Sequence, residues 1–293
     1  MKKTKGVLLL AMGHPYYGRY AHNLAMSLKF SAPDLKICLA YAGNATTHFK
    51  DSMINLFDKI IEIPQKYYTR KNNTEYIKAK TAIYNLSPFD ETIFLDVDML
   101  WLPQKSIFKL FEELENIDFT MQNRGFIDMQ KEDLPKNYVI WADINEVKKE
   151  YNIKKGKYYQ LHSEFVYFKK TAKNKQLFND TIKIYDNLKV NNFLFAGAIP
   201  DELPFSISMC LNEIYPHKDY FTPVYWEVIE KKRLSAQQMY AQYYAYSTGG
   251  SFHIPEMHKF YNNINTFYSR KNGFQFPFSL KDKRDWLMER KNL

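Results

Sequence analysis

The stretch at residues 90–103, DETIFLDVDMLWLP, leads an apolar segment directly into two carboxylates that a single valine separates. Residues 92–95 are expected to form a buried strand, because a turn signal precedes them and Pro103 follows. Alternation along a strand places Asp96 and Asp98 on the same face. Two like charges this close repel each other unless a positive charge lies between them. The pattern therefore predicts a divalent metal ion at the end of this strand.

Apolar strands alternate with helical patterns through the first half of the chain. Strands are expected over residues 7–12, 35–41 and 60–63, and helices over residues 19–30, 51–57 and 77–86. This alternation is typical of an α/β protein with a mostly parallel sheet and helices on both faces. Ligands of such sheets bind at the carboxyl ends of strands, and the aspartate pair lies at such an end.

The second half of the chain is less regular. Polar and basic loops are expected over residues 122–156 with one helix at 144–151, followed by a strand at 164–168 and a helix at 172–188. No linker rich in Pro, Gly or Ser divides the chain. We therefore expect one domain over residues 1–265 with an irregular second half, and a basic C-terminal extension over residues 266–293. The end of the extension is predicted to be a helix packed on the domain, with a membrane-surface anchor as the alternative.

Composition is that of a globular protein. Hydrophobic residues make up 45% of the 293 residues, enough for a sizeable core. The longest apolar run, residues 7–12, is far shorter than the roughly 18 residues that a spanning helix needs, so no transmembrane segment is expected. The start MKKTKGVLLLAMG imitates a signal peptide, but no small-x-small cleavage site follows, and a core strand is predicted instead. The two cysteines, Cys38 and Cys210, lie in apolar stretches, which favours a reducing compartment, the cytoplasm.

The formal net charge of +9 indicates an anionic partner: nucleic acid, a membrane surface or a substrate that carries phosphates. Charge alone does not choose among them. A nucleic-acid-binding protein is one alternative, but the lysines are dispersed and no Arg-Gly or RNP-like signature occurs. A sugar-nucleotide pyrophosphorylase is another, but the sequence after the first strand lacks its glycine-rich phosphate loop.

A metal held by two carboxylates keeps open positions for phosphate oxygens and one further protein ligand. The stretch SFHIPEMHKFYN at residues 251–262 offers that ligand. His253 is expected to end a short strand, and Lys259 follows six residues later in the same loop, placed for a phosphate contact. His253 then completes the ligand set, with His258 as the alternative. Mn²⁺ suits imidazole well, and Mg²⁺ is the alternative metal.

Four blocks of the sequence resemble GT-A-fold glycosyltransferases, and most of all glycosyltransferase family 8, the retaining group that includes glycogenin and bacterial lipopolysaccharide galactosyl- and glucosyltransferases. They are YGRYAHNLAMSL at 17–28, KTAIYNLSPFDETIFLDVD at 80–98, HSEFVYFKK at 162–170 with PDELPFS at 200–206, and HIPEMHKFYN at 253–262. The resemblance implies a Rossmann-like GT-A fold, with Tyr17 stacked on the nucleotide base and Lys80 reaching the donor phosphates or sugar. The resemblance also implies that Asp96 and Lys259 bind the nucleotide-sugar donor together with Lys80.

The chain departs from the family pattern at several positions. In the last block Glu256 replaces a glycine and Phe260 a proline of the loop that closes over the pyrophosphate. His162 and Glu164 replace the asparagine and glycine of Asn-Ser-Gly, and Glu202 replaces a glutamine. In the family these last positions line the donor-sugar and acceptor side. The departures therefore bear on sugar identity more than on reaction type.

Asp201 and Glu202 are the expected catalytic residues. A carboxylate pair after a proline turn suits the binding of donor-sugar or acceptor hydroxyls. The alternative for Asp201 is a helix N-cap ahead of LPFSISMCL, and the two roles are compatible.

Together these observations predict a metal-dependent glycosyltransferase that moves a hexose from a nucleotide diphosphate sugar, UDP-glucose or UDP-galactose, to an acceptor hydroxyl. The resemblance implies retention of configuration, with the leaving phosphate as base. A growing saccharide at the cytoplasmic membrane face is the expected acceptor, where basic segments favour peripheral contact. A modified nucleic acid is the alternative acceptor.

Overall fold

A computed structural model describes residues 3–131, 141–191, 199–217, 221–249 and 255–273. The chain divides into two compact units. Unit 1 comprises Met1–Leu8, Glu62–Phe94 and Asn116–Tyr220, and unit 2 comprises Leu9–Ile61, Leu95–Glu115 and Phe221–Leu293. The extent of the single domain expected from the sequence, residues 1–265, stays a prediction; helix α10 (Pro255–Lys271) continues through residue 265.

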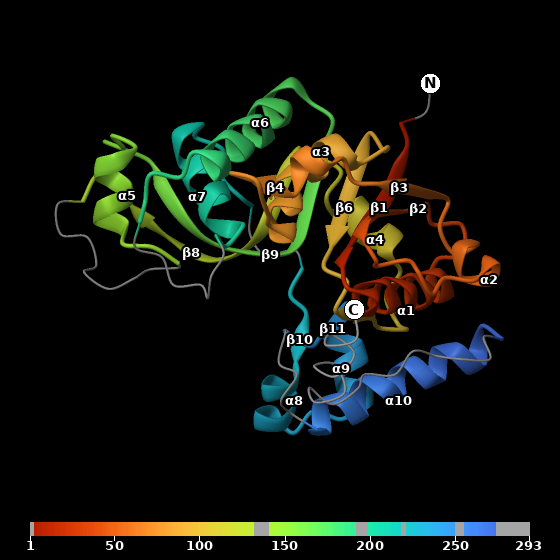
Figure 1. Ribbon diagram of the computed structural model, residues 1–293. Coiled ribbons are helices and arrows are strands. Elements are labelled where there is room, and N and C mark those ends of the chain that lie inside the picture. Colours follow the sequence, from red (N-terminus) through yellow and green to blue (C-terminus); the bar gives the residue numbers. More distant parts are fainter. Residues whose placement is uncertain (1–2, 132–140, 192–198, 218–220, 250–254, 274–293) are drawn as a thin grey trace. The chain divides into compact units, whose positions relative to one another are not determined.

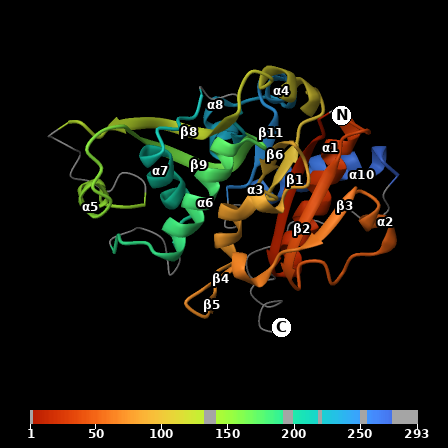
Figure 2. The same ribbon diagram turned by 90° about the horizontal axis from the view of Figure 1, so that it is seen from above.

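A mostly parallel sheet with helices against it confirms the expected α/β class (Figures 1 and 2). Its six strands lie in the order β3-β2-β1-β6-β9-β8. Their bounds are β1 (Lys5–Gly13), β2 (Ile37–Gly43), β3 (Lys59–Glu62), β6 (Glu91–Leu95), β8 (Phe119–Asp128) and β9 (Lys157–Lys169). The predicted strands of the first half are all present, shifted by one to two residues at their ends.

Unit 2 contains the long first helix and a small second sheet. Its further elements are α1 (Pro15–Ser31), α2 (Asp51–Ile54), β7 (Met99–Trp101), α4 (Ile107–Glu113), β10 (Val224–Tyr225), α8 (Trp226–Lys232), α9 (Ala236–Gln242), β11 (Ala245–Ser247) and α10. Helix α1 begins with Pro15, and His14 Nδ1 accepts the Tyr16 N–H at 3.1 Å, a proline start with a side-chain cap. Strand β7 pairs antiparallel with β11, and β10 runs parallel to β11.

Trp101 fixes the strand that follows the aspartate pair. It is fully buried, its backbone N–H donates to Ser27 Oγ at 3.0 Å, and Tyr268 donates its hydroxyl to the Trp101 carbonyl at 2.5 Å. The indole N–H donates to the Lys105 carbonyl at 2.6 Å. Because α1 and α10 both bond to this one residue, the position of β7 is strongly determined.

Unit 1 carries most of the irregular connections. Its further elements are η1 (Gln65–Tyr67), β4 (Thr69–Arg70), β5 (Asn73–Thr74), η2 (Tyr76–Ala82), α3 (Ile83–Leu86), α5 (Ile144–Glu150), α6 (Ala172–Asp186) and α7 (Glu202–Leu211). Helix α7 packs against α6 and lies on β9 (Figures 1 and 2). Ser206 donates its hydroxyl to the Tyr159 carbonyl at 2.8 Å, and Tyr158, Leu203 and Ile207 share one apolar cluster.

Three segments differ from the sequence prediction. The helix expected over residues 77–86 is a 3₁₀ helix, Tyr76–Ala82, followed by the short α-helix Ile83–Leu86. Within it, the ammonium of Lys78 donates to the carbonyls of Lys66 and Thr69. The expected loops at 122–156 give way to β8 up to Asp128, where antiparallel pairing with β9 outweighs the polar composition. Residues 255–262, expected in a loop, begin helix α10.

The departures from the family pattern explain that last difference. A proline inside a helix removes a hydrogen bond and clashes with the preceding turn, and a glycine destabilises it. Here Phe260 and Glu256 occupy those positions, Pro255 is the first helical residue, and Phe260 packs against Tyr246 with ring centroids 4.9 Å apart. The segment is therefore free to be helical.

Further expectations concern the cysteines, membrane spans and the C-terminal extension. Cys38 and Cys210 are free and buried, and burial raises their pKa to about 12 and about 11, so both stay protonated thiols. Across the described ranges, no helix is long and apolar enough to cross a bilayer. The predicted C-terminal helix, with Leu280, Trp286 and Leu287, lies outside the described residues, as does His253.

Candidate functional site

The two aspartates lie in the turn between β6 and β7, within unit 2. Asp96 and Asp98 are half-buried and Val97 between them is buried, the pattern expected when alternate side chains share a face. Strand β11 brings Thr248 opposite Asp98: the Thr248 N–H donates to the Asp98 carbonyl at 3.1 Å, and its hydroxyl donates to Asp98 Oδ2 at 3.2 Å. The orientation of Asp98 is thus set by a strand 150 residues away in sequence.

Buried tyrosines form the surroundings of Asp98. The rings of Tyr20 and Tyr261 are 5.8 Å apart, edge to face, and Asn23 donates to the Tyr261 hydroxyl at 3.2 Å. Burial, followed by neighbouring groups that include Asp98, raises the pKa of both tyrosines. Both phenols are therefore neutral, and the Asp98 carboxylate lies beside a low-dielectric wall, where a bound cation would be strongly attracted.

A divalent metal fits this pair of carboxylates. Asp96 and Asp98 would offer hard oxygen ligands, and the contact from Thr248 orients Asp98, as outer hydrogen bonds do in metal sites. In the described part of the chain no group of three His, Cys, Asp or Glu side chains is arranged to hold a metal. The third predicted ligand, His253, lies outside the described residues, so two of the three expected ligands can be placed.

Three other predicted residues of unit 2 lie on two helices. Tyr17 is in the first turn of α1 and is 38% exposed. Lys259 lies on the exposed face of α10, whereas Tyr261 two residues later is fully buried. His258, the alternative ligand, is half-buried on the same helix. The structure therefore leaves Tyr17 and Lys259 accessible, but the helix turns Lys259 away from the face that Tyr261 presents to Asp98.

Unit 1 brings Lys80 and Glu202 together through a residue that the sequence did not single out. Lys80 Nζ donates to Ser163 Oγ at 3.2 Å, and Ser163 Oγ donates in turn to Glu202 Oε1 at 3.1 Å. Ser163 is buried, whereas Lys80 and Glu202 are half-buried. The signal that points to Ser163 is the serine of the family's Asn-Ser-Gly, which this chain keeps between two changed residues.

Asp201 precedes helix α7 and is almost fully buried. It occupies the N-cap position, but its side chain makes no capping hydrogen bond. Its charge contributes to raising the pKa of Tyr185, after burial and Glu75. The Asp201 carboxylate is therefore buried in unit 1 close to Tyr185. A helix-capping hydrogen bond does not explain its burial, because its side chain makes none.

His162 lies beside this cluster on β9. Burial, then the charge of Arg124, lowers its pKa to about 4. The imidazole is consequently neutral at pH 7.

Comparison with known proteins supports the fold. No protein-family model matches the chain, and no curated protein matches its sequence. Among solved structures, the bifunctional glycosyltransferase WbbM in its apo form has a TM-score of 0.57 at 11% identity over 90% of this chain and 49% of WbbM, so the chain spans about half of that protein. The galactosyltransferase LgtC, in complex with donor and acceptor sugar analogs, has a TM-score of 0.54 at 11% identity over 98% of this chain and 100% of LgtC.

A third neighbour is the apo form of the glycosyltransferase GlyE of Streptococcus pneumoniae, with a TM-score of 0.50 at 9% identity over 95% of this chain and 66% of GlyE. Identities this low establish a shared fold. The chain has the GT-A fold of these glycosyltransferases, as the sequence blocks predicted.

Proposed function

We propose that the protein is a metal-dependent glycosyltransferase that moves a hexose from a nucleotide diphosphate sugar, UDP-glucose or UDP-galactose, to an acceptor hydroxyl with retention. The observation that carries the proposal is the Asp96–Asp98 pair, oriented by Thr248 at the end of β6 on a GT-A fold. A carboxylate pair at the carboxyl end of a sheet strand is where this class of sheet binds ligands.

Unit 2 is assigned to the metal and the nucleotide. Asp96, Asp98 and His253 would hold Mn²⁺ or Mg²⁺, and the metal when bound would neutralise charge on the leaving diphosphate. Tyr17, accessible at the start of α1, is assigned to the base. Lys259 is assigned to the diphosphate on the sequence resemblance alone, because on α10 it lies on a different face from Tyr261.

Unit 1 is assigned to the sugar. Lys80 contributes a positive charge toward the donor, and Glu202 offers a carboxylate to sugar hydroxyls. Ser163 holds both side chains, which supports a joint role. Asp201, buried beside Tyr185, is proposed to orient the start of α7 and the hydroxyls that Glu202 binds. Preorganised polar groups of this kind lower a barrier because they need no rearrangement during the reaction.

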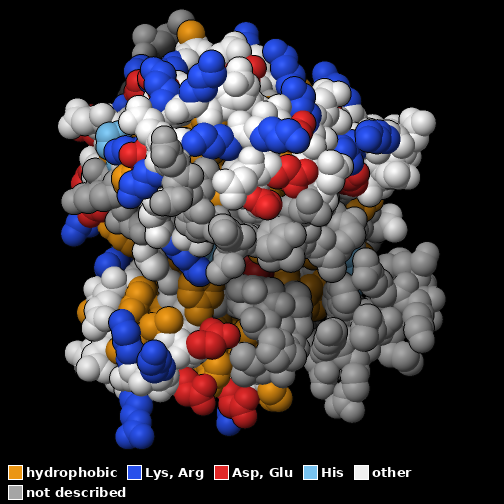
Figure 3. Space-filling view, turned by 90° about the vertical axis from the view of Figure 1, so that its left-hand side faces the viewer, with side chains coloured by type: hydrophobic (Ala, Val, Ile, Leu, Met, Phe, Trp, Pro, Cys, Tyr) orange, Lys and Arg blue, Asp and Glu red, His pale blue; other side chains and the backbone are white. Residues whose placement is uncertain are grey.

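The proposed acceptor is a saccharide hydroxyl, with a modified nucleic acid as the alternative. Figure 3 shows basic side chains spread over one face with acidic side chains among them. A continuous basic stripe would be the footprint of a nucleic-acid-binding protein. The mixed surface on this face therefore favours the saccharide.

A thermal-shift panel tests the proposal. UDP, GDP, TDP, ADP and CMP are each added with Mn²⁺ and with EDTA. A ligand at about 100 times its dissociation constant adds about 2.7 kcal/mol of stability. We expect stabilisation by UDP that requires Mn²⁺ and disappears in Asp98→Ala. Absence of any nucleotide response would contradict the transferase and favour nucleic-acid binding.

A further inference from the structure

Tyr185 lies near the end of α6 and is fully buried in unit 1. Its hydroxyl faces two acceptors, Glu75 Oε2 at 3.0 Å and the Ile199 carbonyl at 3.2 Å. A phenol has one hydrogen to donate, so the two acceptors share it in a three-centre bond. A single hydroxyl thus joins two chain segments that are more than 100 residues apart.

Both acceptors immediately precede elements that carry proposed site residues. Glu75 occupies the position before η2, the short helix that carries Lys80. Ile199 lies two residues before Asp201, which leads into α7 with Glu202. Lys80 and Glu202 both bond to the Ser163 hydroxyl. The segment with Glu75 and Lys80 and the segment with Ile199 and Glu202 are therefore connected twice, through Ser163 and through Tyr185.

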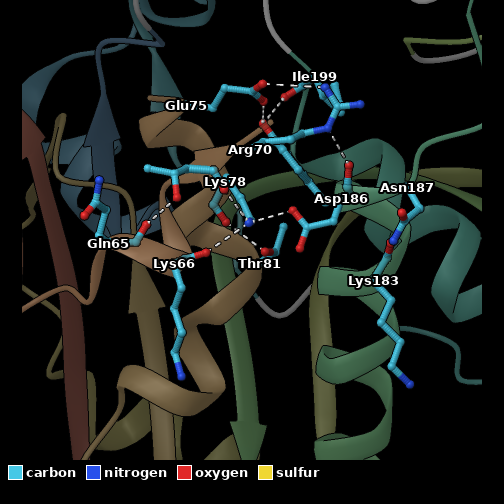
Figure 4. Close-up of polar contacts among 12 residues, drawn as sticks. Gln65, Lys66, Arg70, Glu75, Lys78, Thr81, Lys183, Asp186, Asn187 and Ile199 are labelled. Carbon is cyan, nitrogen blue, oxygen red and sulfur yellow. Dashed lines mark hydrogen bonds and ion pairs between the residues drawn. The ribbon is translucent and has the colours of Figure 1, made fainter. Parts of the chain in front are cut away.

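A closed ring of contacts holds Tyr185 in place. Arg70 donates through Nε to the Tyr185 carbonyl at 3.1 Å, and its guanidinium lies 3.6 Å from Glu75 Oε1. Figure 4 shows Arg70, Glu75 and Ile199 turned toward one another. The Tyr185 hydroxyl and the Arg70 guanidinium thus contact the two different oxygens of the Glu75 side chain.

A second clamp lies beside this ring. The buried ammonium of Lys78 donates to the Lys66 and Thr69 carbonyls at 3.0 and 2.7 Å and pairs with Asp186 at 2.6 Å (Figure 4). All three of its protons have acceptors. Asp186 is the next residue after Tyr185. The contacts of Lys78 and those of Arg70 and Glu75 therefore both connect the end of α6 to the segment that leads to Lys80.

The hydroxyl of Tyr185 stays protonated. Burial, then Glu75 and Asp201, raises its pKa above the ordinary value. It is therefore a hydrogen-bond donor at neutral pH.

We propose that Tyr185 is a positioning residue that couples the Lys80 segment to the Glu202 segment through its shared hydrogen bond. This inference deepens the proposed function and depends on it for its catalytic meaning. The coupling itself is a property of the unliganded chain. Loss of the hydroxyl should loosen both segments together while leaving the nucleotide and metal residues of unit 2 intact.

Tyr167 offers a matched control. It is also a fully buried tyrosine of unit 1, its hydroxyl donates to Glu91 Oε2 at 3.3 Å, and Glu91 pairs with Lys5 at 3.1 Å. The Tyr167–Glu91–Lys5 arrangement thus has the same chemistry as Tyr185–Glu75–Arg70, but its three residues lie on the sheet strands β9, β6 and β1. Tyr185→Phe and Tyr167→Phe each remove one hydroxyl and keep the ring.

The first experiment is amide hydrogen exchange of the full chain without ligand. Loss of one hydrogen bond worth about 1 kcal/mol should speed local opening about fivefold. We expect this increase in residues 75–86 and 199–211 together in Tyr185→Phe and in neither segment in Tyr167→Phe. An increase in one segment alone, in neither, or equally in both variants would overturn the coupling.

The second experiment separates catalysis from binding. With UDP and Mn²⁺, calorimetry should give Tyr185→Phe an affinity equal to that of the unaltered protein, whereas release of UDP from UDP-glucose or UDP-galactose should slow roughly five- to tenfold. Equal losses in affinity and rate would overturn the positioning role. Failure of the unaltered protein to bind UDP would contradict the proposed function, and the exchange experiment would still decide the coupling.

Discussion

Thr248 contacts Asp98 twice, through its backbone N–H to the carbonyl at 3.1 Å and through its hydroxyl to the carboxylate at 3.2 Å. The backbone contact continues the antiparallel pairing of β7 with β11 by one residue. The side-chain contact holds the carboxylate at its Oδ2 atom. Pairing of two short strands is therefore what orients the proposed metal ligand.

Removing the Thr248 hydroxyl should weaken metal binding without disturbing the strands. In Thr248→Val the backbone contact remains, but the carboxylate loses its orienting donor. Loss of such an outer contact reduces metal affinity about 10- to 100-fold. We expect Mn²⁺-dependent UDP binding, measured by calorimetry, to weaken within this range. Thr248→Ser keeps the hydroxyl and should bind as the unaltered protein does; weakening of both variants to the same degree would argue against the role of the hydroxyl.

Lys78 should contribute far more to stability than an exposed lysine on the same unit. Its side chain is 4% exposed and three acceptors surround it. Lys78→Met leaves two part-buried carbonyls and the Asp186 carboxylate without this donor, which should lower the free energy of unfolding by about 2–3 kcal/mol. Lys183, whose side chain is 73% exposed beside Asp180, is the control.

Urea unfolding measures the comparison. Lys183→Met should change the free energy by no more than about 0.5 kcal/mol. Similar losses in the two variants would show that the buried ammonium has no special contribution.

His22 should make stability depend on pH. It is buried in α1, and burial lowers its pKa from 6.5 to about 4. Between these values the unfolded chain binds a proton that the folded chain does not, so stability rises with pH over this window. The contribution is complete above pH 6.5 and is lost as pH falls toward 4, on the order of 3 kcal/mol in total.

Urea unfolding at pH 4.5, 5.5 and 6.5 tests this dependence. We expect His22→Gln to flatten the curve, and His217→Gln, at an exposed position, to leave it unchanged. Part of the slope should remain in His22→Gln, because burial shifts the pKa of His162 in the same direction. A curve of unaltered slope in His22→Gln would exclude His22 as the source.

Local patterns predicted much of this architecture. The aspartate pair, the strands before it and helix α6 follow from alternation and helical spacing within a few residues of sequence. The start of helix α10 is not predicted, because His253 is expected to end a short strand and Lys259 to follow in the same loop, although Pro255 and Glu256 are themselves helix-start signals. Ser163 was missed for a different reason: its partners Lys80 and Glu202 lie 83 and 39 residues away, and no local pattern records such contacts.

Ser163 gives the sharpest test of the sugar-side assignment. Its hydroxyl accepts from Lys80 and donates to Glu202. Ser163→Ala deletes the hydroxyl oxygen and so removes both of these side-chain hydrogen bonds. Ser206→Ala is the matched control, since Ser206 is equally buried and its hydroxyl bonds to the Tyr159 and Glu202 carbonyls. Each variant should lose about 1 kcal/mol of stability. Only Ser163→Ala should slow the release of UDP from UDP-glucose, by about tenfold.

The reason is that Lys80 and Glu202 both lose the Ser163 hydroxyl, although the backbone N–H of residue 163 still donates to Glu202 Oε1 at 3.4 Å. In Ser206→Ala both side chains keep the Ser163 hydroxyl. Initial rates at saturating UDP-glucose, followed by chromatography of UDP, measure the effect. Glu202→Gln keeps an oxygen that accepts from Ser163, so this variant should retain more activity than Ser163→Ala. Equal rates for Ser163→Ala and Ser206→Ala would remove Ser163, and with it the joint action of Lys80 and Glu202, from the proposed mechanism.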